Sequence, residues 1–152
     1  MDKLYPIIGQ ITYSLTRIDF LISNIAFDFG LAETPYIYFA KSKFEKKIDN
    51  LKDGLKAKLK DDALMTELDE WTNNLHELRE KRNNIIHSII LSNPAEVEEF
   101  AFFNYRNDKT GNLIKDFNKY SLTDLKLLNQ DFIDTHNKGH ILWGKLRDAQ
   151  LN

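Results

Sequence analysis

Residues 64–91, LMTELDEWTNNLHELREKRNNIIHSIIL, contain the pattern that decides the fold. Large apolar residues recur in this stretch at alternating spacings of four and three, which predicts one long amphipathic helix with a single apolar seam. The helix is expected to end near Leu91, because Ser92, Asn93 and Pro94 follow. The seam positions are Leu64, Leu68, Trp71, Leu75, Leu78, Arg82, Ile85 and Ile89.

The same period opens the chain and predicts a first helix from Leu4 to Phe29, stopped at Gly30. Its seam equals the later one in length, so the two helices are expected to lie side by side as the spine of a bundle. Thr34 and Pro35 mark a break, and residues 39–59 are expected to form another helix between the two.

The pattern changes beyond Pro94. Residues 99–106 and 113–119 flank a turn at 107–112 and predict a β-hairpin. Ser121-Leu-Thr-Asp124 is a capping arrangement that predicts a last helix. Gly139 lies on the seam of this helix, where another backbone is expected to approach closely. We therefore predict one mainly α domain over residues 1–152. It is an up-down bundle of four to five helices, with a small β-hairpin at about 99–119 inserted before the C-terminal helix.

Composition excludes several classes of function. The chain has no cysteine, so it has neither a cysteine nucleophile nor a thiolate zinc site nor a disulfide framework. No apolar run is long enough to cross a bilayer, and the first residues, MDKLYPIIGQITYS, do not resemble a secretion signal. We expect a cytoplasmic protein that does not bind membranes.

Residues 41–60 contain eight lysines against three acidic residues, although the formal net charge of the whole chain is −2. Lysine-rich helix surfaces are common and are usually solvated. The alternative is a local patch that follows a phosphate backbone.

Arg82 stands at a seam position where every other residue is large and apolar. Arginine is rarely buried without a partner. Three explanations are open. The aliphatic part of the side chain is covered while the guanidinium reaches solvent, or Arg82 pairs with a carboxylate such as Asp19 or Asp28. The third is that Arg82 is held in a cleft for an anionic ligand.

A polar line flanks the seam, because His76, Glu80, Asn83 and His87 follow one another at spacings of four, three and four. One interpretation is a solvent-facing strip with two ordinary histidines. His87 lies about 140° around the helix from Arg82, so the two do not share one stripe. The other interpretation takes Arg82-Asn83-Asn84-Ile85-Ile86-His87 as one functional string.

This string resembles the hallmark of the HEPN superfamily, helical domains of toxin–antitoxin, abortive-infection and other RNA-cleaving systems. The hallmark is an arginine, a polar residue that is often asparagine, and a histidine a few residues later. The resemblance extends over residues 4–91 and includes Arg17-Ile18-Asp19 and the segment 44–48. Ile89 stands where the branch paired with nucleotidyltransferase antitoxins has a tyrosine, so the abortive-infection-like branches fit better.

The resemblance implies a metal-independent endoribonuclease without a cofactor, acting as a homodimer with a composite active site. Arg82 would bind the scissile phosphate, His87 would transfer a proton, and Asn83 would orient the His87 ring or the phosphate. RNA would be the substrate, and an antitoxin or regulatory protein is a possible partner. The RNA-binding candidates are Lys41, Lys43, Lys46, Lys47 and Arg79, and the supporting candidates are Glu80, His76 and Asp19.

Two other interpretations stay open. One is a non-catalytic HEPN-like module that binds RNA, a nucleotide or a protein through the same cleft. The other is a structural helical dimer in which Arg82 is an ion-pair residue.

Two weaker patterns also have alternatives. His136 and His140 have a spacing that can hold zinc, but they lack an HExxH string and a good third ligand, so no metal site is predicted. The aromatic residues of the hairpin either stack on bases or, as we favour, pack on the helices.

Overall fold

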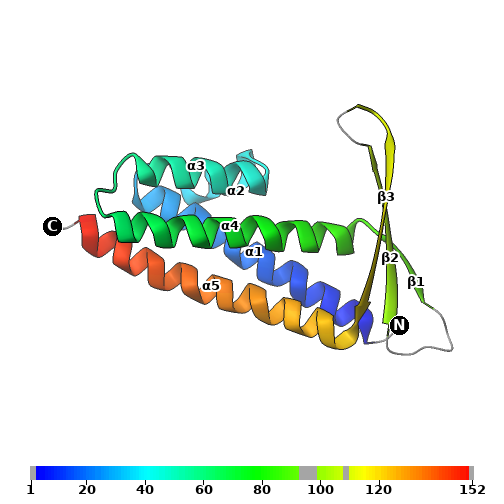
Figure 1. Cartoon of the computed structure of the whole chain (residues 1–152). Coiled ribbons are helices and arrows are strands. Elements are labelled where there is room, and N and C mark those ends of the chain that lie inside the picture. The colour runs from blue at the N-terminus through cyan, green and yellow to red at the C-terminus, as the bar shows by residue number, and fades with distance from the viewer. Residues whose placement is uncertain (1–2, 93–98, 108–109, 151–152) are drawn as a thin grey trace.

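Three long helices form the body of the computed structural model, two short helices lie along one side of it, and a sheet closes one end (Figure 1). The structure describes residues 3–92, 99–107 and 110–150. In this part of the chain no helix is both long and apolar enough to cross a membrane. The elements are α1 (Leu4–Asp28), α2 (Pro35–Lys41), α3 (Phe44–Lys56), α4 (Asp62–Ile86), β1 (Ile89–Ser92), β2 (Glu99–Asn107), β3 (Leu113–Ser121) and α5 (Leu122–Gln150).

The predicted fold class is confirmed: the chain is mainly helical, with an antiparallel hairpin, β2 and β3, directly before the C-terminal helix. The predicted cap of that helix is also present. The Asp124 backbone N–H donates to Ser121 Oγ at 3.0 Å, and the Ser121 N–H donates to Asp124 Oδ2 at 2.7 Å. These two bonds satisfy donors that a helix start would otherwise leave unpaired.

The expected end of the third long helix was wrong. α4 ends at Ile86, His87 caps it, and Ile89–Ser92 form strand β1. β1 pairs antiparallel with β2, so that Ile90 lies opposite Phe102, and the sheet has the order β1-β2-β3. The β-branched run continues the apolar pattern, but its backbone hydrogen bonds go to a neighbouring strand that the local sequence does not announce.

The expected helix over residues 39–59 is two helices, α2 and α3. Thr34 caps α2 by accepting from the Ile37 N–H at 3.2 Å, and the chain is extended at Ser42 and Lys43. Lys47 of α3 donates from Nζ to the Phe39 carbonyl near the end of α2. That contact satisfies a carbonyl that the end of a helix leaves free, and so it stabilises the break.

α5, rather than α4, is the main partner of α1. α1 makes its most extensive helix contacts with α5, and α4 also contacts α5 more than it contacts α1. The predicted seams nevertheless supply the core. Buried side chains from all three long helices include Leu4, Ile11, Ile18, Ile22, Ile25, Leu64, Leu68, Trp71, Leu75, Leu78, Ile85, Leu125, Phe132, Leu142 and Leu146.

Gly139 is the point of closest approach between α5 and its neighbours. A Cβ at this position would lie 2.6 Å from Cζ2 of Trp71 and 2.8 Å from Cδ2 of Leu21. Trp71 cannot easily turn away, because its indole Nε1 donates to the Thr135 carbonyl at 2.9 Å. The nearest atoms at Gly139 thus belong to side chains of α1 and α4, and not to another backbone as expected.

Gly139→Ala is therefore expected to destabilise the protein. Overpacking a core costs about 1–3 kcal/mol, whereas alanine gains about 1 kcal/mol over glycine as a helix former. Gly144→Ala is the matched control, because a Cβ at Gly144 meets nothing within 4 Å and should only stabilise α5. Urea unfolding of both variants measures the difference, and equal effects would show that α5 has room at Gly139.

The two faces of the hairpin differ. Directly opposed residues of an antiparallel pair share a face. Phe100 and Phe102 are buried against the helices, while Phe103 and Phe117 pair on the outer face with ring centroids 4.7 Å apart. Tyr105 is half exposed on the same outer face. Packing on the helices is therefore confirmed for Phe100 and Phe102 and is wrong for Phe103 and Phe117.

Candidate functional site

Arg82 lies in a groove between α1, α3 and α4, with a volume of about 380 Å³. The groove is lined by residues of α1, by Lys43 and the start of α3, and by residues of α4. Its lining is mixed, with hydroxyl, charged and apolar side chains: Thr12, Leu15, Thr16, Asp19, Lys43, Phe44, Glu45, Arg79, Arg82 and Asn83. We call it the Arg82 groove.

The guanidinium of Arg82 makes few interactions with the described part of the protein. Nη1 donates to Asn83 Oδ1 at 3.1 Å, whereas Nε is buried and has no hydrogen-bond partner. Within residues 3–92, 99–107 and 110–150, no carboxylate forms an ion pair with it. Burial lowers the pKa of Arg82, but an arginine stays charged at neutral pH. The groove therefore holds a partly desolvated cation with donors to spare.

Neither carboxylate considered as a partner for Arg82 pairs with it. Asp19 lines the same groove, but both its oxygens accept from Lys47 Nζ, at 2.8 and 3.0 Å. Asp28 accepts from Trp143 Nε1 at 2.8 Å and lies 3.7 Å from Arg147 Nε. The ion-pair explanation of Arg82 finds no partner at either position.

His87 does not line the Arg82 groove. It caps the C-terminal end of α4, where its backbone N–H donates to the Asn83 carbonyl at 3.1 Å, and its side chain is exposed. Asn83 is the link between the two, because its side chain contacts Arg82 and its backbone holds His87. Within this chain, the arginine and the histidine thus face different surroundings.

Lys47 is not part of an exposed basic surface, contrary to expectation. Its side chain is 2% exposed, its ammonium is bound by Asp19 and the Phe39 carbonyl, and it lies 4.7 Å from the centroid of the Phe39 ring. A lysine at this position on α3 faces α1 and α2, so it anchors the short helices to α1. It has no donor left for a phosphate.

Two further lysines of the predicted basic stretch are neutralised within the fold. Lys52 and Lys56 both pair with Asp69, at 2.9 and 2.7 Å, and hydrogen bonds from these lysines lower the pKa of that carboxyl. Lys43 and Lys46 are exposed, and Lys43 also lines the Arg82 groove. The backbone of Lys41 ends α2, whereas its side chain lies outside the described part of the protein.

The other predicted residues tie α4 to α3. Arg79 Nη1 lies 2.5 Å from Glu45 Oε2, and its Nη2 lies 3.5 Å from Glu80 Oε1. His76 Nε2 lies 3.0 Å from Asp49 Oδ1. The predicted polar line of α4 is therefore divided: His76 contacts α3, Glu80 lies beside Arg79 of α4 itself, and His87 stands apart at the end of the helix.

A second groove, of about 430 Å³, lies on the other side of Arg79 and Asn83. The last turns of α4 and the strands β2 and β3 form it, and Asn84, Asn104, Asp116 and Asn118 line it together with Glu80 and Phe117. We call it the amide groove. No sequence pattern groups these residues, because the sheet register and the position of the hairpin beside α4 bring them together.

Comparisons with protein families, with curated proteins and with solved structures find no match to this chain. The chemistry of the two adjoining grooves is therefore what bears on function.

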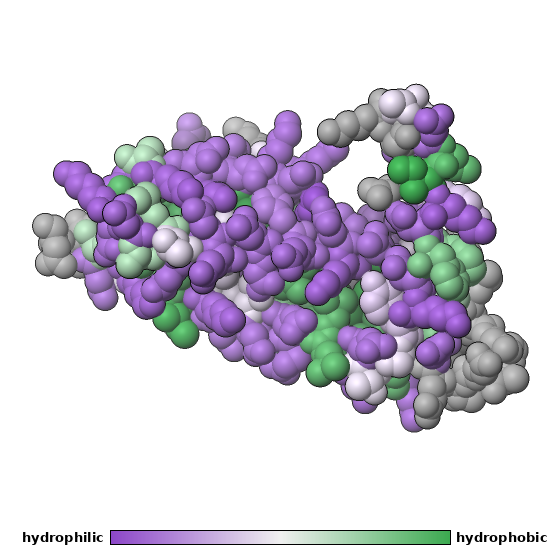
Figure 2. Space-filling model, viewed as in Figure 1, coloured by the Kyte–Doolittle hydropathy of each residue, from purple (hydrophilic) through white to green (hydrophobic). Residues whose placement is uncertain are grey.

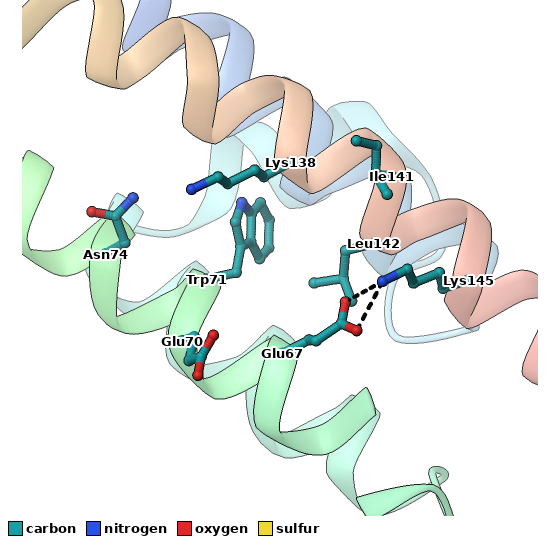
Figure 3. A pocket seen from close by; sticks show the side chains of 8 residues that line it. All are labelled: Glu67, Glu70, Trp71, Asn74, Lys138, Ile141, Leu142 and Lys145. Carbon is teal, nitrogen blue, oxygen red and sulfur yellow. Dashed lines mark hydrogen bonds and ion pairs between the residues drawn. The ribbon is translucent and has the colours of Figure 1, made fainter. Parts of the chain in front are cut away.

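A third groove, between α4 and α5, contains none of the predicted site residues (Figure 3). Trp71 forms its floor, and Lys145 and Glu67 bridge the two helices with an ion pair at 2.7 Å. This ion pair joins exposed side chains and contributes little to stability.

The histidine pair of α5 has no third metal ligand among the described residues. The rings of His136 and His140 lie 4.6 Å apart, and burial, with the nearby charges of Arg17 and His140, lowers the pKa of His136. The described residues contain no group of three side chains that could hold a metal ion.

Proposed function

We propose that this protein is a metal-independent endoribonuclease of the HEPN type. The observation that carries the proposal is the state of Arg82: a charged, half-buried guanidinium on a groove, with a buried Nε that has no partner and no carboxylate to neutralise it in the described structure. A buried cation of this kind is costly to keep unless a ligand uses it. A phosphodiester supplies the planar pair of oxygens that an arginine binds best.

The reaction needs a base, an acid and charge stabilisation. His87, with an exposed imidazole, would take the proton of the RNA 2′-hydroxyl or give one to the leaving group. The 2′-oxygen then bonds to phosphorus, and the bond to the 5′-oxygen breaks. Arg82 stabilises the charge on the phosphate oxygens. The products are a 2′,3′-cyclic phosphate and a 5′-hydroxyl, and DNA is spared because it lacks the nucleophile.

A homodimer would complete the site. Since His87 lies outside the Arg82 groove of its own protomer, a two-fold contact near the end of α4 is needed to bring it to the Arg82 of a second copy. A toxin or antiphage role in the cytoplasm, controlled by an antitoxin or regulatory protein, follows only from the resemblance of residues 82–87.

The test is RNA cleavage in excess chelator. Wild-type protein is expected to cut single-stranded RNA with 2′,3′-cyclic phosphate ends and to leave DNA of the same sequence intact, whereas His87→Ala loses activity by about 100-fold or more. His140→Ala is the matched control, because this histidine is exposed on α5, away from both grooves. Equal activity of wild type and His87→Ala would contradict the mechanism.

A non-catalytic binding module is the second candidate. The separation of His87 from the Arg82 groove within one protomer favours it. RNA binding that depends on Arg82, without cleavage by the wild-type protein, would establish this alternative.

A further inference from the structure

The amide groove adjoins the Arg82 groove. Arg79 and Asn83 line both grooves. The grooves are therefore neighbouring compartments, separated by this part of the α4 surface. The space-filling view shows the hairpin standing away from the hydrophilic surface of the helices, with a hollow between the two (Figure 2). A ligand held by Arg82 therefore has a second compartment directly beside it.

Asparagine side chains from three elements gather in this compartment. Asn83 and Asn84 come from α4, Asn104 from β2 and Asn118 from β3. Asn118 lies opposite Phe102, which is buried against the helices, and directly opposed residues share a face of the sheet. Asn104 and Asn118 therefore project from the face of the hairpin that looks toward α4.

The amides in this groove have unused hydrogen-bonding capacity. Asn84, Asn104 and Asn118 are half-buried, and their side chains form no hydrogen bond with any other described residue. Each amide offers two donors and an oxygen acceptor side by side. The edge of a nucleobase offers the complementary pattern, and proteins read unstacked RNA bases through such contacts.

The charges of the groove favour a base over a phosphate. Arg79, its cation, is already matched by Glu45 and Glu80, and Asp116 adds a further carboxylate to the lining. Among the described residues of its lining, a phosphate would meet no unpaired cation. In the neighbouring groove, by contrast, Arg82 and the exposed Lys43 can bind it.

We propose that the amide groove binds one unstacked nucleobase of single-stranded RNA, next to the phosphate held by Arg82. This inference rests on the proposed function for the position of that phosphate. Asn84, Asn104 and Asn118 are then specificity-determining residues. They select the base beside the bond that is cut, and they take no part in the proton transfers.

Binding in the absence of cleavage tests this assignment. The full-length His87→Ala protein is titrated, by fluorescence anisotropy, with short labelled oligoribonucleotides of A, of C, of U, and of alternating G and U. We expect a preference of roughly tenfold for one of them, the usual value of one bidentate contact to a base. Asn118→Ala and Asn104→Ala should each reduce this preference to about threefold or less. Their affinity for the disfavoured oligomers should fall by a smaller factor than their affinity for the preferred one.

Asn73→Ala is the matched control, because Asn73 is exposed on α4 outside both grooves and should leave the preference unchanged. Thermal melting of each variant checks its fold, and Asn84→Ala probes the groove from the helix side if a strand variant is unstable. The absence of any base preference, or a preference that survives all three substitutions, would overturn the inference.

The cleavage assay separates this result from the proposed reaction. Wild-type protein that cuts RNA without any base preference would sustain the ribonuclease and overturn the base site. Base-selective binding that depends on Asn118, in a wild-type protein that does not cut, would sustain the base site and overturn the ribonuclease.

Discussion

Arg82→Ala is expected to lower the rate of RNA cleavage by about 100- to 1,000-fold, the usual loss when one preorganised charge donor is removed from an active site. The folded state should be hardly affected, because Arg82 makes one hydrogen bond, to its neighbour Asn83, and no ion pair with the described residues. Arg82→Lys should fall between wild type and alanine, since an ammonium keeps the charge and loses the planar fork. Initial rates and melting temperatures measure both effects.

Mixing two inactive variants tests the composite site directly. If Arg82 of one copy acts with His87 of the other, a heterodimer of Arg82→Ala and His87→Ala retains one intact site. Random exchange of subunits then restores about a quarter of the wild-type activity. If the two residues acted within one copy, no mixed dimer would contain an intact site and no activity would return.

A control variant and a contrary result complete this experiment. Lys81→Ala removes an exposed cation next to Arg82 and should change the cleavage rate far less. Should Arg82→Ala unfold the protein while Arg82→Lys cleaves as the wild type does, Arg82 would be a structural residue.

Lys47→Ala is expected to lower the free energy of unfolding by about 3 kcal/mol. Its ammonium is buried, bonded to both oxygens of Asp19 and to the Phe39 carbonyl, and removing one partner of a buried ion pair leaves an uncompensated charge. Lys46→Ala, the exposed neighbour, should change stability by about 0.5 kcal/mol at most. Urea unfolding followed by circular dichroism measures the two variants.

The loss of unfolding free energy in Lys47→Ala should become smaller at acid pH. Burial already raises the pKa of Asp19 in the folded protein, and Lys47 opposes this effect. Without Lys47, the pKa of Asp19 in the folded protein rises further. The loss of stability is therefore complete at pH values above that pKa, and it becomes smaller as the pH falls and Asp19 takes up a proton. A loss of RNA affinity in Lys47→Ala at unchanged stability would contradict the structural role and return Lys47 to the RNA-binding residues.

The seams of α1, α4 and α5 could be recognised without a structure, because a helix core face repeats every three or four residues. Arg82 stood out for the same reason, as the charged exception in that repeat. The cap at Ser121 was equally local, since it needs only two side chains three residues apart. Interactions that depend on neighbours along the chain are the ones that sequence patterns encode.

Lys46 and Lys47 show where such patterns stop. They are adjacent and chemically identical, yet the first is exposed and the second is buried, because α3 turns only one of them toward Asp19 on α1. His87 and Ile89 are a similar case. The apolar period continues past Ile86, but pairing with β2 ends the helix and leaves His87 at its edge.

By itself, then, the sequence determined the long helices, the hairpin and the oddity of Arg82, all of which depend on local spacing. Tertiary structure decided which lysines are paired, where α4 ends, and that Asn104 and Asn118 lie beside Asn83. These outcomes depend on contacts between segments that are far apart in the sequence, such as α1 with α3 and α4 with the sheet. The two grooves therefore exist only in the folded chain, where a partly desolvated guanidinium and amides without a partner among the described residues lie on either side of one part of α4.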